Sequence, residues 1–143
     1  MTCRVAVFNN HGRYRVPGQK TRDYAMRVLR LAGIRKAEIR IVFVDSQYCR
    51  KINKEFLGSD EVTDVISFPL EASPNLEGEV YVNIDSARRQ ARDFRVSIAN
   101  EVARLVIHGV LHLVGYDDTT RGKGAAMRKR EDAHVRYWFS GKG

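Results

Sequence analysis

The sequence is poor in cysteine and histidine and has no long hydrophobic segment. Its 143 residues contain two cysteines, Cys3 and Cys49, which are too far apart in sequence to form a metal-binding cysteine pair. We therefore expect two reduced thiols and a cytoplasmic protein. No apolar run approaches the roughly 20 residues that span a bilayer, and the N-terminal segment lacks the pattern of a signal peptide, so no membrane partner is expected.

Acidic residues are also scarce relative to basic ones. Seventeen Asp and Glu stand against 25 Lys and Arg, which gives a formal net charge of +8. Such a surplus is typical of proteins that bind a polyanion such as RNA, because Lys and Arg displace counterions from phosphates; a generic basic surface is the alternative. Apolar residues make up 43% of the chain, which indicates a globular protein, and the length suits one domain over residues 1–143.

Hydrophobic periodicity predicts the order strand–helix–strand–helix–strand–strand–helix–helix–helix. Pro69 is expected to end the third strand, and Asp85 is expected to cap the helix after the fourth strand. The predicted fold class is α/β (α+β), a single domain with one mixed sheet of about four strands and helices packed on it. The strands are expected at residues 2–9, 37–45, 63–70 and 79–84, with a polar loop at 71–78, and the helices at 20–33, 46–58, 86–94, 98–114 and 124–139.

The segment HGVLHLVGYDD, residues 108–118, carries two of the four histidines of the chain. His108 and His112 are four residues apart on a predicted helix, so both project from one face, as two imidazole ligands of a single metal ion require. Gly115 permits a sharp turn that returns the chain to the same ion. Asp118, or its neighbour Asp117, is then the third ligand, and zinc, nickel, cobalt, iron and manganese all accept this ligand set.

Three protein ligands leave a fourth position for water, which is the pattern of a catalytic rather than a structural metal site. In a zincin peptidase the residue after the first histidine is a glutamate that acts as the base, but this sequence has Gly109 at that position. Peptide hydrolysis by that route therefore lacks its base. Phosphodiester cleavage depends instead on stabilising the charge of phosphate oxygens, and in RNA the 2′-hydroxyl is a possible internal nucleophile.

The segments TDVISFP, GEVYVN and HGVLHLVGYDD together resemble the YbeY family of bacterial and organellar endoribonucleases, in order from about Ile41 to Trp138. The resemblance implies a small α/β domain with a zincin-like metal helix and zinc-dependent cleavage of single-stranded RNA. It also implies a role in maturing the 3′ end of small-subunit ribosomal RNA and in ribosome quality control. The implied partners are ribosomal RNA and the small ribosomal subunit, with no organic cofactor.

Two positions depart from the pattern of the family. Its common signature ends in a third histidine where this sequence has Asp118, and the extra negative charge should weaken the activation of water. Many relatives carry an arginine before TDV, where this sequence has Leu57. Arg104, one turn before His108, is the candidate to supply the missing cation, unless it is a solvated helix residue. The candidate catalytic residues are therefore His108, His112 and Arg104, and the candidate zinc ligands are His108, His112 and Asp118.

Further basic and polar residues allow two interpretations each. The first group could bind phosphates or form solvated helix faces, and it comprises Arg88, Arg92, Arg95 and the segment RKR at 128–130. The second group could line the cleft or serve the turn before a strand, and it comprises Thr63, Asp64 and Ser67. His11 lies in a predicted loop and has no companion ligand nearby in the sequence.

Three functions remain open on the sequence alone. The leading hypothesis is a zinc-dependent endoribonuclease. A metallopeptidase is supported by the ligand spacing but opposed by Gly109 and the basic charge. A non-catalytic, ribosome-associated RNA-binding protein, in which the metal only stabilises the helix and turn, is favoured by Leu57 and Asp118.

Overall fold

The computed structural model describes residues 2–59, 61–71 and 75–139, and it contains one four-stranded mixed sheet. The strand order is β1 (Thr2–Asn9), β2 (Lys36–Val44), β4 (Asn75–Asn83), β3 (Val65–Glu71). β1 and β4 each pair with β2 in parallel, whereas β3 pairs with β4 antiparallel and forms an edge. This arrangement confirms the predicted fold class.

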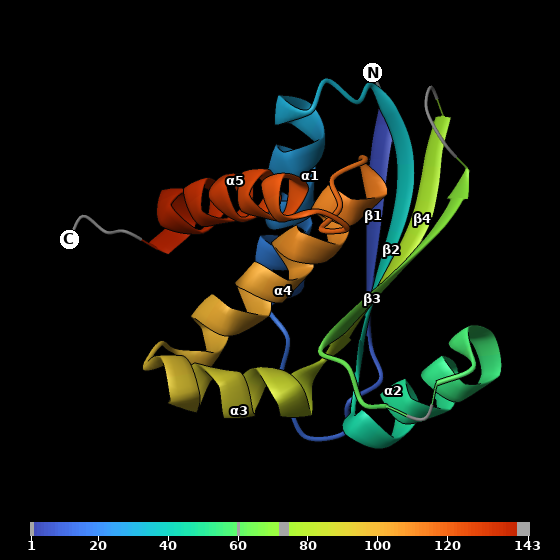
Figure 1. Cartoon of the computed structure of the whole chain (residues 1–143), viewed down its shortest axis with the longest axis vertical. Coiled ribbons are helices and arrows are strands. Elements are labelled where there is room, and N and C mark those ends of the chain that lie inside the picture. The colour runs from blue at the N-terminus through green and yellow to red at the C-terminus, as the bar shows by residue number, and fades with distance from the viewer. Residues whose placement is uncertain (1, 60, 72–74, 140–143) are drawn as a thin grey trace.

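Helix α4 (Ile98–Leu113) lies against β3 and β4 and also contacts α1 (Gly18–Leu31), α3 (Ile84–Phe94) and α5 (Arg121–Phe139). Figure 1 shows α1, α4 and α5 on one side of the sheet, with α3 at one end of α4. Helix α2 (Ser46–Ile52) and the π-helical turn η1 (Asn53–Leu57) lie at the lower end of the sheet in that view. The central helix α4 therefore positions its exposed side chains between the sheet edge and α5.

The strand β2 explains why the core has two parts. Its side chains alternate between exposed and buried at first, and the last four residues are all buried. Ile39, Ile41 and Phe43 join the main core between the sheet and helices α1 and α4. Val42 and Val44 face the other side, where α2 covers them. Burial on both faces at the end of this strand is what the continuous apolar run of residues 41–44 predicts.

Gly109 lets α4 approach the sheet closely. A Cβ atom at this position would lie well under 3.0 Å from Cγ1 of Val80, 3.2 Å from Cγ2 of Val65 and 3.3 Å from Oγ of Ser67. Ser67 also donates a hydrogen bond to the carbonyl of Gly109 over 2.9 Å. The glycine is thus a point of close contact between helix and sheet.

Two strand boundaries differ from the sequence expectation. β3 does not end at Pro69 but continues to Glu71, with a register shift between these two residues. Proline is tolerated there because β3 is an edge strand whose outer side has no strand partner. Residues 75–78 belong to β4 rather than to the expected polar loop, of which residues 72–74 lie outside the described part of the chain.

The expected cap of α3 was also wrong. Asn83, not Asp85, accepts the capping hydrogen bond, from the backbone N–H of Ser86. Asp85 instead joins two distant segments, because its Oδ1 lies 2.9 Å from Nε2 of His11 and its Oδ2 accepts the backbone N–H of Ser46. His11 therefore has a structural partner that its loop sequence did not reveal.

No single helix among the described residues is long and apolar enough to cross a membrane. α3 and α4 would pass on length and composition as a pair, but they are bent by 118° relative to each other. Most of α4 is buried against the rest of the fold, which accounts for its apolar sequence.

Candidate active site

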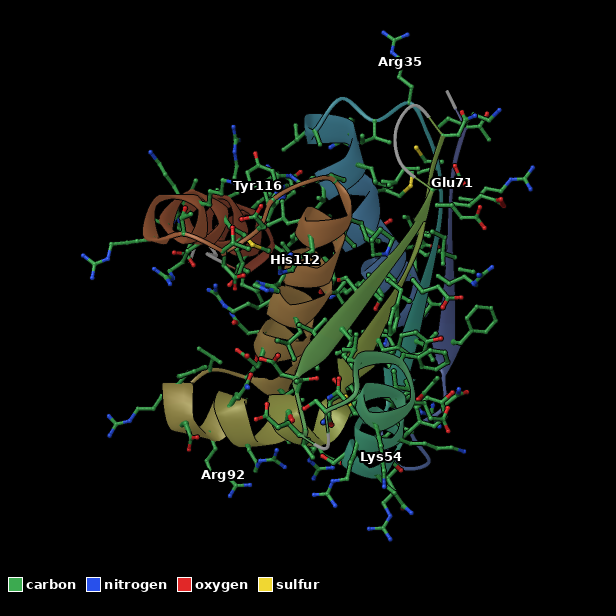
Figure 2. The ribbon with its side chains drawn as sticks, turned by 45° about the vertical axis from the view of Figure 1, so that its right-hand side comes forward. Arg35, Lys54, Glu71, Arg92, His112 and Tyr116 are labelled. Atoms are coloured by element: carbon green, nitrogen blue, oxygen red, sulfur yellow. The ribbon has the colours of Figure 1, made fainter. Side chains whose placement is uncertain are left out.

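His108 and His112 project from one face of α4, as their spacing predicts. The helix begins after Ser97, whose side chain accepts the backbone N–H of Asn100. The two imidazole rings have centroids 4.8 Å apart and are inclined by 73°. Figure 2 shows His112 near the C-terminal end of α4, close to the turn that carries Tyr116.

The turn after α4 gives the adjacent Asp117 and Asp118 different surroundings. Gly115 has a φ of +115°, and the backbone N–H groups of Gly115 and Tyr116 return to carbonyls in the last turn of the helix. Asp117 accepts hydrogen bonds from the backbone and hydroxyl of Thr119 and does not line the cleft. Asp118 lines the same cavity as His108 and His112. Asp118, rather than Asp117, therefore shares a cavity with the two histidines, and its role as third ligand stays a prediction.

Two adjoining cavities form the cleft. One, of about 480 Å³, lies between β3, η1 and α4, and it is lined by Leu57, Ser67 and His112 among others. The other, of about 270 Å³, lies between α3, α4 and α5. Asp64, His108 and Asp118 line both, so the two cavities meet at His108.

The sequence reasoning missed Glu131, which comes from α5 and holds His108 in place. Its Oε1 lies 2.6 Å from Nδ1 of His108, and its Oε2 accepts Nη1 of Arg104 over 2.5 Å. An ionised carboxylate only accepts hydrogen bonds, so Nδ1 of His108 carries the proton and Nε2 faces away from Glu131. Only the crossing of α5 over α4 reveals this contact, since 23 residues separate the two partners.

The two histidines have opposite protonation tendencies. Burial opposes the charged form of His108, but the hydrogen bond and charge of Glu131, helped by Asp64 and Asp118, outweigh it and raise the pKa of His108. Burial and the neighbouring His108 lower the pKa of His112. His112 therefore favours the neutral form that binds a metal through its lone pair.

A buried carboxyl lies deeper in the smaller cavity. Glu101 is 2% exposed, and burial raises its pKa to about 7, although Arg104 acts in the opposite direction. Asp64 accepts a hydrogen bond from Gln90 over 3.1 Å. The acidic lining of this cavity is thus partly neutralised by protonation and by hydrogen bonds.

The donor chemistry of the cleft fits a divalent transition metal. His108 has the carboxylate partner on one ring nitrogen that metal-binding histidines commonly have, and this partner leaves Nε2 for an ion. His112 and Asp118 line the cavity beside it. Within residues 2–59, 61–71 and 75–139, no three His, Cys, Asp or Glu side chains are close enough together to form a complete ligand set. The two histidines form the base of such a site, and zinc stays a prediction.

The candidate cation Arg104 lines the smaller cavity, as expected from its place one turn before His108. Its guanidinium is bound to two carboxylates, Glu131 and Asp132, at 2.5 and 2.8 Å. The charge of Arg104 is therefore already paired with these two carboxylates. A role of Arg104 in catalysis stays a prediction. Leu57 lines the larger cavity, where it contributes no charge.

The remaining candidate residues divide between the cleft and other surfaces. Asp64 and Ser67 line the cleft, and Thr63 lies beside them. Arg88, Arg92 and Arg95 are exposed on α3 or at its end and line neither cavity; Figure 2 shows Arg92 directed away from His112. From the segment 128–130, only Arg128 lines the smaller cavity.

Comparisons with known proteins agree on one family. The sequence profile of the family described as "Endoribonuclease YbeY" matches residues 7–138. A protein named endoribonuclease YbeY from Chlorobium phaeovibrioides is 35% identical over 133 residues, which cover 93% of this chain and 90% of that protein. A protein of the same name from Chlorobaculum tepidum is 41% identical over 97 residues, which cover 68% of this chain and 71% of that protein. A Thermotoga maritima protein with a known solution structure superposes with a TM-score of 0.63 at 25% identity, over 92% of this chain and 87% of its own.

Proposed function

The chain belongs to the YbeY family of endoribonucleases, and we propose that it cleaves single-stranded RNA at a metal site formed by His108, His112 and Asp118. The observation that carries this proposal is the cleft itself. Both histidines and Asp118 line one cavity, and Glu131 fixes the ring of His108 so that Nε2 remains available. We propose zinc as the ion, because imidazole nitrogens and a carboxylate oxygen are ligands that zinc accepts.

Some residues of the cleft would bind the ion, and others orient the residues that bind it. His108, His112 and Asp118 would hold the ion, which supplies Lewis acidity toward a phosphate oxygen and activates water at neutral pH. Glu131 is a positioning residue, because it acts on the ion only through His108. Asp64 and Ser67 line the floor of the cleft beside β3, where a nucleotide would lie.

Gly109 argues against peptide hydrolysis by the zincin route. A Cβ atom at position 109 would clash with Val80 and press on Val65 and Ser67, so a glutamate could not be accommodated there unless α4 or the sheet shifted. In RNA cleavage the attacking water or 2′-hydroxyl must still lose a proton, and an ion held by His108, His112 and Asp118 would help by lowering the pKa of water, without a glutamate at position 109.

Cleavage of a labelled RNA tests the function. We expect the purified chain to cut a single-stranded RNA and to leave a duplex of the same sequence intact, and His112→Ala to lose this activity. Asp117→Asn is the matched control, since Asp117 bonds to Thr119 and does not line the cleft. Activity that survives His112→Ala in metal-free buffer contradicts the proposal. The product ends identify the nucleophile: a 2′,3′-cyclic phosphate reports attack by the 2′-hydroxyl, and a linear phosphate reports attack by water.

We further propose that the RNA is a precursor of small-subunit ribosomal RNA with an unprocessed 3′ end, met in the cytoplasm on the small subunit. The family and the net charge of +8 support this substrate. Incubation with small subunits that carry a 3′-extended RNA tests it. Trimming to one discrete end is expected, whereas equal cutting throughout the accessible RNA contradicts this choice of substrate.

A further inference from the structure

The cavity of about 270 Å³ has among its lining residues Arg128, which belongs to the segment RKR that the sequence left with two interpretations. Arg128 lines this cavity from α5, one turn before Glu131, and its side chain is exposed. Gly124, four residues earlier, lies against Asp118, so this face of α5 follows the cleft. The histidine that binds Glu131, His108, lines the same cavity. Arg128 therefore reaches the solvent beside the candidate metal site.

The cations around the cleft are not equivalent. Arg104 is held by two carboxylates, so its charge is largely neutralised before any substrate arrives. Arg128 forms no ion pair with any described residue. The larger cavity has no Lys or Arg among its described lining residues, and Leu57 contributes an apolar side chain there. Within the described parts of the cleft, Arg128 is the arginine whose charge remains available.

We propose that Arg128 binds a backbone phosphate of the RNA at the mouth of this cavity and supplies the positive charge that the described lining of the larger cavity lacks. This inference rests on the proposed function and names the phosphate-binding residue of the same site. A guanidinium offers paired donors that match phosphate oxygens, and an exposed arginine loses little solvation when it binds one. The carboxylates deeper in the cavity repel a phosphate, so it is held at the mouth, beside Arg128.

The next residue along the chain provides a matched control. Lys129 is also exposed and carries the same charge, but it lines none of the cavities described. A general electrostatic effect of α5 on RNA would be reduced alike by Arg128→Ala and Lys129→Ala. A specific phosphate contact would be lost only with Arg128→Ala.

The experiment measures cleavage of a single-stranded RNA and, separately, its binding in a chelating buffer by fluorescence anisotropy. We expect Arg128→Ala to lower kcat/KM about 10- to 100-fold and to reduce the salt dependence of binding by about one phosphate contact. Lys129→Ala should stay within about twofold of the wild type, and Arg128→Lys should recover the salt dependence. Thermal denaturation of each variant reports whether the fold is intact.

The two arms separate this inference from the proposed function. If the wild type cleaves RNA but Arg128→Ala and Lys129→Ala behave alike, the inference is overturned and the function stands. If the wild type binds RNA without cleaving it and only Arg128→Ala weakens binding, the inference stands and the function fails. A salt dependence of Arg128→Lys as low as that of Arg128→Ala also overturns the inference, because the charge is then not what matters.

Discussion

Replacing Gly109 by alanine tests most sharply how closely α4, the helix that carries His108 and His112, packs on the sheet. The added methyl group would lie well under 3.0 Å from Cγ1 of Val80, which is fully buried. Val65 and Ser67, at 3.2 and 3.3 Å, block the directions in which it could move. Either α4 shifts away from the sheet or Val80 is displaced, and both disturb the core beneath His108.

The magnitude follows from two opposing effects. Overpacking a well-filled core typically costs about 1–3 kcal/mol, and the closeness of this contact places the cost near the upper value. Alanine is favoured over glycine inside a helix by about 1 kcal/mol, which offsets part of the cost. We therefore expect Gly109→Ala to lower the free energy of unfolding by about 2 kcal/mol and the Tm by about 5–10 °C.

Thermal and urea denaturation of Gly109→Ala measure this effect, with Gly122→Ala as the control. Gly122 lies in α5, and a Cβ there would meet nothing within 4 Å, so its replacement should be neutral or slightly stabilising. Equal stability of Gly109→Ala and the wild type would refute the close packing of α4 on the sheet. The claim that no glutamate can be accommodated at position 109 would fail with it.

Three further predictions concern stability and metal binding. Burial, with nearby arginines, lowers the pKa of His134 to about 4, so the unfolded chain binds this proton more readily and stability falls from about pH 6.5 toward pH 4. The free energy of unfolding, measured by urea denaturation at each pH, should fall by about 3 kcal/mol over this range, and His134→Gln should flatten this pH profile. An unchanged pH profile in His134→Gln contradicts the prediction. Asp85→Ala removes the partner of His11 and should cost about 1–3 kcal/mol in the same assay, whereas a neutral effect would mean that this link contributes nothing. Glu131→Gln removes the carboxylate on His108 and should weaken metal binding about 10- to 100-fold by competition with a chelator; unaltered affinity argues against Glu131 as a positioning residue.

The element order and the two-histidine face were predictable because both depend on short-range periodicity. The spacing of His108 and His112 places them on one helical face in any structure that keeps the helix. The burial of both faces of β2 was likewise predictable from the continuous apolar run at residues 41–44. The sequence alone does not show which of Asp117 and Asp118 lines the cavity of the histidines, since the two residues are adjacent and chemically identical. The geometry of the turn after α4 decides it.

The rest of the site could not be predicted because it depends on how helices cross. Glu131 meets His108 only because α5 lies across α4, and the same crossing pairs Arg104 with carboxylates. The sequence offered Arg104 as the cation of the site, whereas the structure pairs it with Glu131 and Asp132 and gives Arg128, in the lining of the same cavity, no ion pair with any described residue. Pro69 was misjudged for a similar reason, as its place on an edge strand is a property of the whole sheet.

The central claim is that His108, His112 and Asp118 hold an ion that RNA cleavage requires. Metal content and the rate of cleavage of a single-stranded RNA, measured on the same sample, test it most directly. Chelation should remove the metal and the activity together, and added zinc should restore both in the wild type but neither in His112→Ala. Full cleavage by the metal-free wild type, or by His112→Ala, would contradict the account.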